Sequence, residues 1–156
     1  MAIEKVRAYF ETKGVADRIL EFPVSSATVD LAAAALGCEP RRIAKTLSFD
    51  VGGRTVLIVM AGDARIDNRK FKDHFGTKAA MLKADEAEAR IGHAVGGVCP
   101  FAVNEGVEVW LDESLKRFET VFPACGSSNS AIEVTIPELE ALAAPVGWID
   151  AAKAAE

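Results

Sequence analysis

The chain has 156 residues, a formal net charge of −5 and 50% hydrophobic residues, which suits one soluble globular domain with a sizeable core. No apolar run approaches the roughly 18 residues that a membrane-spanning helix needs, and the segment 1–10 lacks the apolar core of a signal peptide. The acidic balance excludes wrapping of a long nucleic-acid backbone, although Arg41, Arg42 and Lys45 can form a local basic patch. We therefore expect a single domain over residues 1–156, located in the cytoplasm.

The cysteines and histidines favour neither disulfides nor a metal centre. Cys38, Cys99 and Cys125 are odd in number and lack CxxC spacing. His74 and His93 show no ligand spacing with them. We expect no metal and no cofactor.

The first third of the chain alternates helical and extended signals. Ile3, Val6 and Phe10 have helical spacing and Gly14 follows them, which predicts an amphipathic helix closed by a glycine. A short strand over 18–23 comes next. Serine and threonine N-cap candidates at 25–28 and Gly37 then bound a predicted helix over 29–36, with a turn at 39–41 leading onward.

The middle of the chain predicts a hairpin. The β-rich runs Ile43–Asp50 and Thr55–Ala61 flank two glycines, which supply positive φ in a tight turn. Because the second run is apolar at consecutive positions, both of its faces should be covered. Asp67 then caps a predicted helix that ends before Gly76.

The remaining third alternates short elements with two loops of small residues. We predict strands over 78–82, 107–112, 120–123 and 131–135, helical segments over 85–91, 113–118 and 138–143, an apolar segment over 146–149 and a frayed tail over 151–156. This irregular alternation with a hairpin indicates an α/β domain with a mixed, mostly antiparallel central sheet flanked by helices.

Lys45 is the residue that the predicted strands leave unexplained. It shares the apolar face of its strand with Leu47 and Phe49. Burying an ammonium costs several kcal/mol unless the group is paired or lies in a polar cleft, so Lys45 is a candidate site residue. The alternative is a lysine that reaches solvent at the sheet edge with its stem packed. Asp30, Asp63 and Glu133 are possible carboxylate partners, and the sequence does not choose among them.

Two loops suit ligand binding through backbone N–H groups, because small residues let the main chain approach a ligand closely. The first contains Gly96-Gly97-Val98-Cys99-Pro100-Phe101 and the second Gly126-Ser127-Ser128-Asn129. Neither has a phosphate-loop pattern, and the alternative is two ordinary turns.

A cysteine hydrolase is a remote alternative. It would need Cys99 as nucleophile and His93 or His74 as base. The sequence places neither histidine beside Cys99, and isolated cysteines are usually small buried residues.

Three stretches in order resemble the YbaK/prolyl-tRNA-synthetase-associated editing-domain family. They are Arg42-Ile43-Ala44-Lys45-Thr46-Leu47, the loop from Gly96 to Phe101, and Gly126 to Glu133. The resemblance covers nearly the whole chain and implies a compact mixed α/β domain that hydrolyses the ester linking a wrong amino acid to tRNA, often tRNA(Pro). It implies that Lys45 is the essential lysine.

The resemblance also implies the binding residues and the partners. Gly96, Gly97, Val98, Cys99 and Pro100, with Phe101 beside them, match the loop that holds the aminoacyl ester. Gly126, Ser127, Ser128 and Asn129 match the second pocket wall. The implied partner is the acceptor end of an aminoacyl-tRNA, with a synthetase as a possible recruiter and with no membrane and no DNA.

One position departs from the family's alanine-specific pattern. Those members resemble GSxxxH, whereas this chain has Ala131 where the histidine would fall. The departure argues against an alanyl substrate and leaves cysteinyl, seryl, threonyl or another small group open. A binding module of the same fold that does not turn its ligand over is the second hypothesis.

Overall fold

The computed structural model describes residues 2–26, 28–94 and 97–154. Its helices are α1 (Ala2–Lys13), α2 (Val29–Leu36), α3 (Asn68–Phe75), α4 (Ala84–Ile91) and α5 (Ile136–Ala143), with 3-10 turns η1 (Ala16–Arg18), η2 (Pro40–Arg42) and η3 (Glu113–Arg117). Its strands are β1 (Leu20–Glu21), β2 (Ile43–Val51), β3 (Arg54–Ala61), β4 (Ala64–Ile66), β5 (Glu108–Asp112), β6 (Thr120–Pro123), β7 (Ser130–Ala131), β8 (Val134–Thr135), β9 (Gly147–Ile149) and β10 (Ala152–Ala154).

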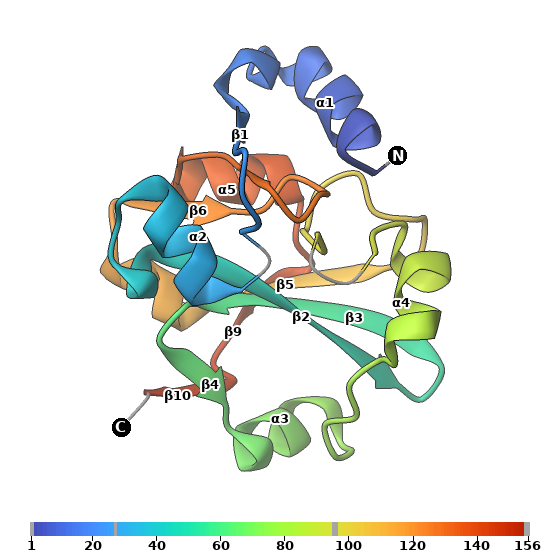
Figure 1. Cartoon of the computed structure of the whole chain (residues 1–156). Coiled ribbons are helices and arrows are strands. Elements are labelled where there is room, and N and C mark those ends of the chain that lie inside the picture. Colours follow the sequence, from blue (N-terminus) through green and yellow to red (C-terminus); the bar gives the residue numbers. More distant parts are fainter. Residues whose placement is uncertain (1, 27, 95–96, 155–156) are drawn as a thin grey trace.

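A six-stranded sheet forms the centre of the molecule, with strand order β8-β6-β2-β3-β5-β9 (Figure 1). The predicted hairpin is confirmed: β2 and β3 pair antiparallel from Ala44↔Ala61 to Val51↔Arg54. β6 lies parallel to β2, and β5 and β9 continue the sheet in parallel beyond β3. The mixed α/β fold is therefore confirmed. The sheet was expected to be mostly antiparallel. The β2–β3 hairpin is its longest ladder and is antiparallel, but β6, β5 and β9 are added by shorter parallel ladders.

The alternation of side chains along β3 divides the core between the two faces of the sheet. Leu57 and Val59 join the larger core, which α1, α4 and α5 cover. Val56, Ile58 and Met60 join the second core, where Phe49 packs on Phe71 of α3. All five side chains of this run are fully buried. The prediction that both faces of the second hairpin strand are covered is thus confirmed.

Local capping signals bound the helices as the sequence predicts. The Thr28 side chain accepts a hydrogen bond from Leu31 N at the start of α2, and Gly37 ends that helix with a positive φ of 68°. The Asp67 carboxylate accepts from the backbone of Arg69 and Lys70 at the start of α3. Such caps are worth about 1 kcal/mol each because they satisfy backbone N–H groups that have no partner within the helix.

Three predictions for short segments are wrong. The tail expected to be frayed over 151–156 forms β10 at 152–154, which pairs antiparallel with β4, and residues 155 and 156 lie outside the described part of the chain. Residues 78–82 form no strand, and only Met81 bridges to Phe49. The predicted strand over 131–135 is two short strands, β7 pairing with β1 and β8 with β6. In each case a partner from a distant part of the chain decides the conformation.

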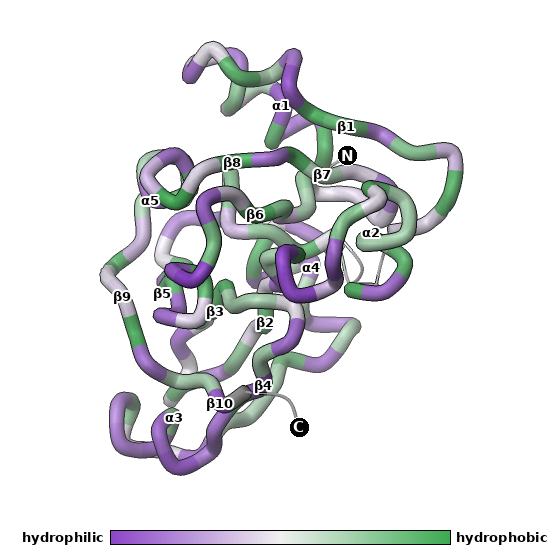
Figure 2. The backbone as a smooth tube through the Cα atoms, turned by 90° about the vertical axis from the view of Figure 1, so that its left-hand side faces the viewer, coloured by the Kyte–Doolittle hydropathy of each residue, from purple (hydrophilic) through white to green (hydrophobic). Residues whose placement is uncertain are grey.

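The hydropathy of the chain follows this layering (Figure 2). The tube is mainly hydrophilic along α3, whose Phe71 is nevertheless buried against the sheet. Among the described residues, no helix combines the length and the apolar character that crossing a membrane requires.

Candidate functional site

A pocket of about 400 Å³ lies where the sheet opens along one edge of β2. β6 pairs with β2 only at Ile43 and Ala44. Further along the same strand, the backbone N–H of Leu82 donates to the Ser48 carbonyl. The stretch between these two attachments has a neighbouring strand only in β3, among the described residues, and it forms the floor of the pocket. The opening is a direct result of β6 diverging from β2 after two residues.

The pocket is lined mainly by small apolar and hydroxyl side chains from distant elements. The hydroxyl residues of its lining are Ser26, Thr28, Thr46, Ser48 and Ser130. The small apolar ones include Ala32, Ala84, Val98, Ala124 and Ala131. Lys45 is the one charged residue in this described lining. A pocket of this composition suits a small ligand that carries polar groups.

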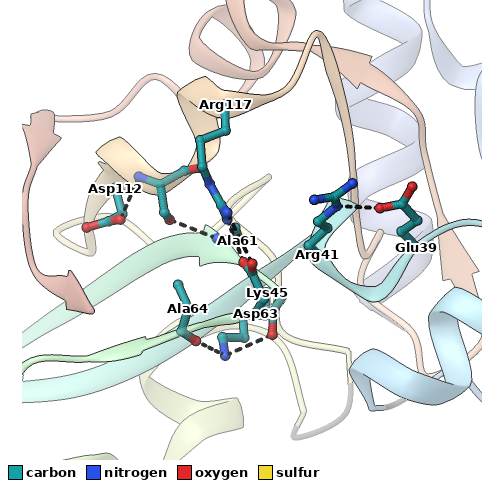
Figure 3. A network of polar contacts seen from close by, with 10 residues as sticks. Glu39, Arg41, Lys45, Ala61, Asp63, Ala64, Asp112 and Arg117 are labelled. Carbon is teal, nitrogen blue, oxygen red and sulfur yellow. Dashed lines mark hydrogen bonds and ion pairs between the residues drawn. The ribbon is translucent and has the colours of Figure 1, made fainter. Parts of the chain in front are cut away.

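Lys45 lies half-buried on β2, opposite Met60 of β3. Its Nζ donates a hydrogen bond to the carbonyl of Ala64 and a second one, at 3.4 Å, to the carbonyl of Gly62 (Figure 3). No other hydrogen-bond acceptor of Nζ exists among the described residues. An ammonium has three N–H donors, so one remains for a ligand.

The electrostatics of Lys45 are those of a partly desolvated cation. Burial lowers its pKa, the carboxylate of Asp63 opposes that shift, and Arg65 adds to it. Lys45 forms no ion pair within the described part of the chain. Of the three carboxylates left open by the sequence, Glu133 binds Arg42 and Asp63 binds Arg117. Asp30 forms no ion pair with Lys45 within the described residues either, so two backbone carbonyls are the partners of this ammonium.

The first loop divides between the pocket and the core. Gly96 lies outside the described residues. Val98 lines the pocket, whereas Cys99, Pro100 and Phe101 are buried, and Phe101 packs edge-on against Phe10 with ring centroids 4.9 Å apart. The loop therefore anchors itself in the larger core and presents one side chain of this group to the pocket.

Gly97 brings the two predicted loops into direct contact. A Cβ at this position would lie 2.8 Å from the backbone of Gly126 and Ser127. Real Cβ atoms essentially never approach backbone this closely, so the contact requires glycine. The sequence predicted the two loops separately, and the structure brings them together.

The second loop is held next to the pocket by hydrogen bonds, although most of its residues do not line the pocket. Ser127 Oγ lies 3.0 Å from Asn129 Oδ1, which can only accept, and 2.7 Å from Ser130 Oγ, which can donate to it. The Asn129 amide donates to the Phe22 carbonyl at 2.9 Å. The Ser128 carbonyl accepts from the backbone N–H of Ser26. Of this loop and its neighbours, Ser130 and Ala131 line the pocket, while Gly126, Ser127, Ser128 and Asn129 do not.

Sequence reasoning missed the pocket residues on the 26–36 segment. Thr28 was expected only as a helix cap, yet it lines the pocket together with Ser26 and Ala32. The hydrogen bonds from Phe22 and Ser26 to the second loop bring this segment there. These contacts join residues about 100 positions apart, and no local pattern signals them.

Cys99 and His93 lie side by side, with 3.5 Å between Cys99 Sγ and His93 Nε2. His93 Nε2 is also 2.7 Å from the Phe101 carbonyl, which can only accept, so this nitrogen carries the proton. It cannot take a proton from the thiol in this tautomer. Both side chains are fully buried, and burial raises the pKa of the Cys99 thiol to about 12. This geometry is that of a packed core pair and not of an activated nucleophile.

The expected basic patch is largely neutralised. Arg42 pairs with Glu133 at 3.2 Å and donates to Thr120, and Arg41 pairs with Glu39. Among the described residues, no three His, Cys, Asp or Glu side chains lie together in a way that could hold a metal ion.

The structure is thus a mixed α/β domain whose central hairpin contributes a lysine to the lining of a small pocket. The particular family follows from comparison: the family model for the aminoacyl-tRNA editing domain matches residues 24–142, and the chain belongs to this family. The matched region contains Lys45 and both loops.

Individual relatives agree with that assignment. The uncharacterized protein YwhH of Bacillus subtilis is 50% identical over 154 residues, which cover 98% of each chain. A proline–tRNA ligase of Geobacillus kaustophilus is 32% identical over 103 residues, which cover 65% of this chain but only 18% of the ligase. The present chain thus corresponds to one segment of a much longer synthetase.

Solved structures share the complete fold. A crystal structure described as a "putative trans-editing enzyme for prolyl tRNA synthetase" superposes with a TM-score of 0.87 at 29% identity over 97% of each chain. The hypothetical protein APE2540 superposes with a TM-score of 0.84 at 29% identity, over 96% of this chain and 99% of the other.

Proposed function

We propose that this protein is a trans-acting aminoacyl-tRNA deacylase that hydrolyses the ester of a small mischarged amino acid, with tRNA(Pro) as the tRNA. The observation that carries the proposal is Lys45, a lining residue of a small pocket whose ammonium donates to two backbone carbonyls and keeps one N–H to spare. The family to which the chain belongs and the synthetase relatives supply the substrate class.

The chemistry needs no nucleophile from the protein. A water oxygen attacks the carbonyl carbon of the ester, the bond from that carbon to the ribose oxygen breaks, and the ribose oxygen takes up the proton that the water loses. Negative charge develops on the carbonyl oxygen during the attack. The Lys45 ammonium can stabilise this charge because it is preorganised and partly shielded from water, where a cation acts more strongly than in bulk solvent.

The pocket supports a small aminoacyl group. Alanine and valine side chains narrow its wall, and serine and threonine hydroxyls provide hydrogen-bond partners. A difference of one methylene in such a pocket is worth about 1–3 kcal/mol, so size gives modest discrimination and hydrogen bonds must add the rest. Cysteinyl, seryl and threonyl groups all fit this description. An alanyl group is disfavoured, because Ala131 stands where the alanine-specific members that the chain resembles have a histidine.

Single-turnover deacylation tests the proposal. The panel is cysteinyl-, alanyl-, seryl- and threonyl-tRNA(Pro), each with its cognate pair, and the proteins are wild type and Lys45→Ala. We expect hydrolysis of one pair by the wild type and a loss of at least about 10²-fold in the variant, the effect of removing a single oxyanion donor. Equal rates in the two proteins would remove Lys45 from the mechanism.

A binding module without turnover is the second candidate, because the same pocket and lysine would hold an aminoacyl ester equally well. Retained binding of a mischarged tRNA with no hydrolysis across the panel would favour it. The acceptor end is the proposed contact in either case, since the cations Arg41 and Arg42 are paired with carboxylates and the chain is acidic overall. Recruitment by a synthetase belongs to the same proposal, and co-purification with prolyl-tRNA synthetase tests it.

A further inference from the structure

The turn between β3 and β4 holds Lys45 by both of its hydrogen bonds. This turn, residues 61–64, contributes the carbonyls of Gly62 and Ala64 that accept from Nζ (Figure 3). With two of the three N–H groups of the ammonium directed at fixed acceptors, tetrahedral geometry leaves one direction for the third. The orientation of the free N–H therefore depends on where the turn is held.

An arginine on η3 holds the turn. Both terminal nitrogens of Arg117 bind the Asp63 carboxylate, one of them at 3.1 Å, in a fork that fixes position and direction. Arg117 Nε also donates to the Ser114 carbonyl at 3.0 Å. The guanidinium thus joins the turn to η3 through three hydrogen bonds.

Ser114 adds a second attachment at the start of the turn. Its hydroxyl oxygen accepts from Ala61 N at 3.1 Å, and its own N–H donates to the buried carboxylate of Asp112 at 2.8 Å. The other oxygen of Asp112 accepts from Ala151 N. The support of the turn therefore continues into the buried end of β5.

Gly62 closes the arrangement from the opposite side. A Cβ there would lie 2.0 Å from the Pro40 carbonyl of η2 and 2.9 Å from the Val29 side chain of α2. The φ of Gly62 is not the reason for glycine at this position, since it lies outside the left-handed range. The close approach of η2 is the reason, so the turn packs tightly against η2 as well as being bound to η3.

We infer that Asp63 and Arg117 are positioning residues for Lys45, acting through the turn whose two carbonyls orient the ammonium. The inference rests on the proposed function for its effect on rate, although the geometry stands without it. Neither residue lines the pocket, so neither is expected to touch the aminoacyl group.

The charges around Lys45 give the inference a specific signature. Asp63 faces it from the turn and Arg65 from β4, while Arg117 and Arg41 face Asp63 from η3 and η2. Removing the Asp63 charge takes away the group that holds the pKa of Lys45 up, so Asp63→Asn should lower that pKa further. Arg117→Gln removes a cation and leaves the Asp63 carboxylate in place. In this variant the pKa of Lys45 should therefore not fall, in contrast to Asp63→Asn.

The experiment measures the pKa of Lys45 directly by competitive acetylation with acetic anhydride across a pH series, read by mass spectrometry of the Lys45 peptide. The proteins are wild type, Asp63→Asn, Arg117→Gln and Arg117→Lys. Arg54→Gln is the matched control, since Arg54 forms the same kind of exposed pair with Glu108 at the far end of the hairpin. Because labelling needs no substrate, it tests the arrangement even if the deacylase proposal fails.

Single-turnover rates then test whether the two residues act through Lys45. We expect Arg117→Gln to lower the rate about tenfold or more in the wild-type background, as a small misplacement of a catalytic group does. Arg117→Lys should recover part of the loss, because lysine restores the charge but not the fork. In a Lys45→Ala background the substitution should have no further effect. A Lys45 pKa unchanged in Asp63→Asn, or a rate in Arg117→Gln equal to that of Arg54→Gln, would overturn the inference.

Discussion

Two polar sites of this fold differ in their access to solvent. Lys45 lines a pocket, whereas Cys99 and His93 form a pair in the core. Lys45 is half-buried, lowered in pKa by burial, and left with an unused donor. Cys99 and His93 are fully buried, and burial moves the thiol pKa to about 12. Both groups are perturbed by desolvation, but only one is accessible. The contrast teaches that a perturbed pKa marks a candidate site only when solvent and substrate can reach the group.

The sharpest test of this contrast exchanges the two groups for alanine. We expect Lys45→Ala to lose at least about 10²-fold in deacylation rate with little change in stability, because the lysine stem is only partly packed. Cys99→Ala should keep its rate and lose about 1–2 kcal/mol of unfolding free energy through the cavity that it leaves. Single-turnover kinetics and urea denaturation measure the two quantities. Full loss of activity in Cys99→Ala would reverse the assignment of roles.

Much of the fold could be predicted because it follows from rules that act within a few residues. Thr28 and Gly37 bound α2, Asp67 begins α3, and the two glycines after Asp50 close the central hairpin. Each of these depends on a cap or on a backbone angle that one residue type supplies. The sequence also singled out Lys45, since a charge on an apolar face is visible without knowing the fold.

What the sequence could not predict depends on contacts that no cap, spacing or propensity specifies, whether within one loop or between distant segments. The alanine-rich stretch at 152–154 has no strand signal of its own and forms β10 because β4 lies beside it. His93 lies beside Cys99 because the Phe101 carbonyl accepts from its ring. Thr28 lines the pocket because the Ser128 carbonyl holds the preceding segment. No spacing or propensity contains these pairings.

Gly97→Ala is the next largest perturbation and tests how far the pocket depends on its two loops. The added methyl would overlap the backbone of Gly126 and Ser127, and overpacking of this kind costs about 1–3 kcal/mol. We expect a lower melting temperature and a weaker binding of the substrate, because Val98 and Ser130 line the pocket on either side of this contact. Gly147→Ala is the control, since its Cβ would meet only the Trp110 ring at an ordinary 3.4 Å. Equal effects in the two variants would contradict the importance of the loop contact.

A smaller effect concerns pH and His93. Burial lowers the pKa of His93, so the unfolded chain binds more protons than the folded one between that lowered value and about 6.5. Stability should therefore fall as the pH falls below about 6.5. The variant His93→Gln should lose this part of the acid dependence, measured as the unfolding free energy in urea at pH 7 and pH 5. An unchanged slope in the variant would mean that other groups cause it.

The smallest expected effect is on thiol modification. Cys38 is partly exposed, whereas Cys99 and Cys125 are buried, and burial raises the pKa of all three thiols. Iodoacetamide at neutral pH should label Cys38 alone in the folded protein and leave the deacylation rate unchanged. Mass spectrometry counts the labels, and urea-unfolded protein serves as the control with all three cysteines labelled. Inactivation that follows modification of Cys99 would contradict the role of a core residue.

Under the proposed function, the divergence of β6 from β2 separates the part of the pocket that would govern reactivity from the part that would govern the choice of ligand. Lys45 and its carbonyl acceptors belong to the central hairpin and its turn, while Ala32, Ala84 and Val98 reach the opening from a helix, another helix and a loop. Enlarging one of these three side chains narrows the space without displacing the ammonium. Under the proposed function, variants with different selectivity can therefore arise on this scaffold by single substitutions at Ala32, Ala84 or Val98, with Lys45 and its acceptors unchanged.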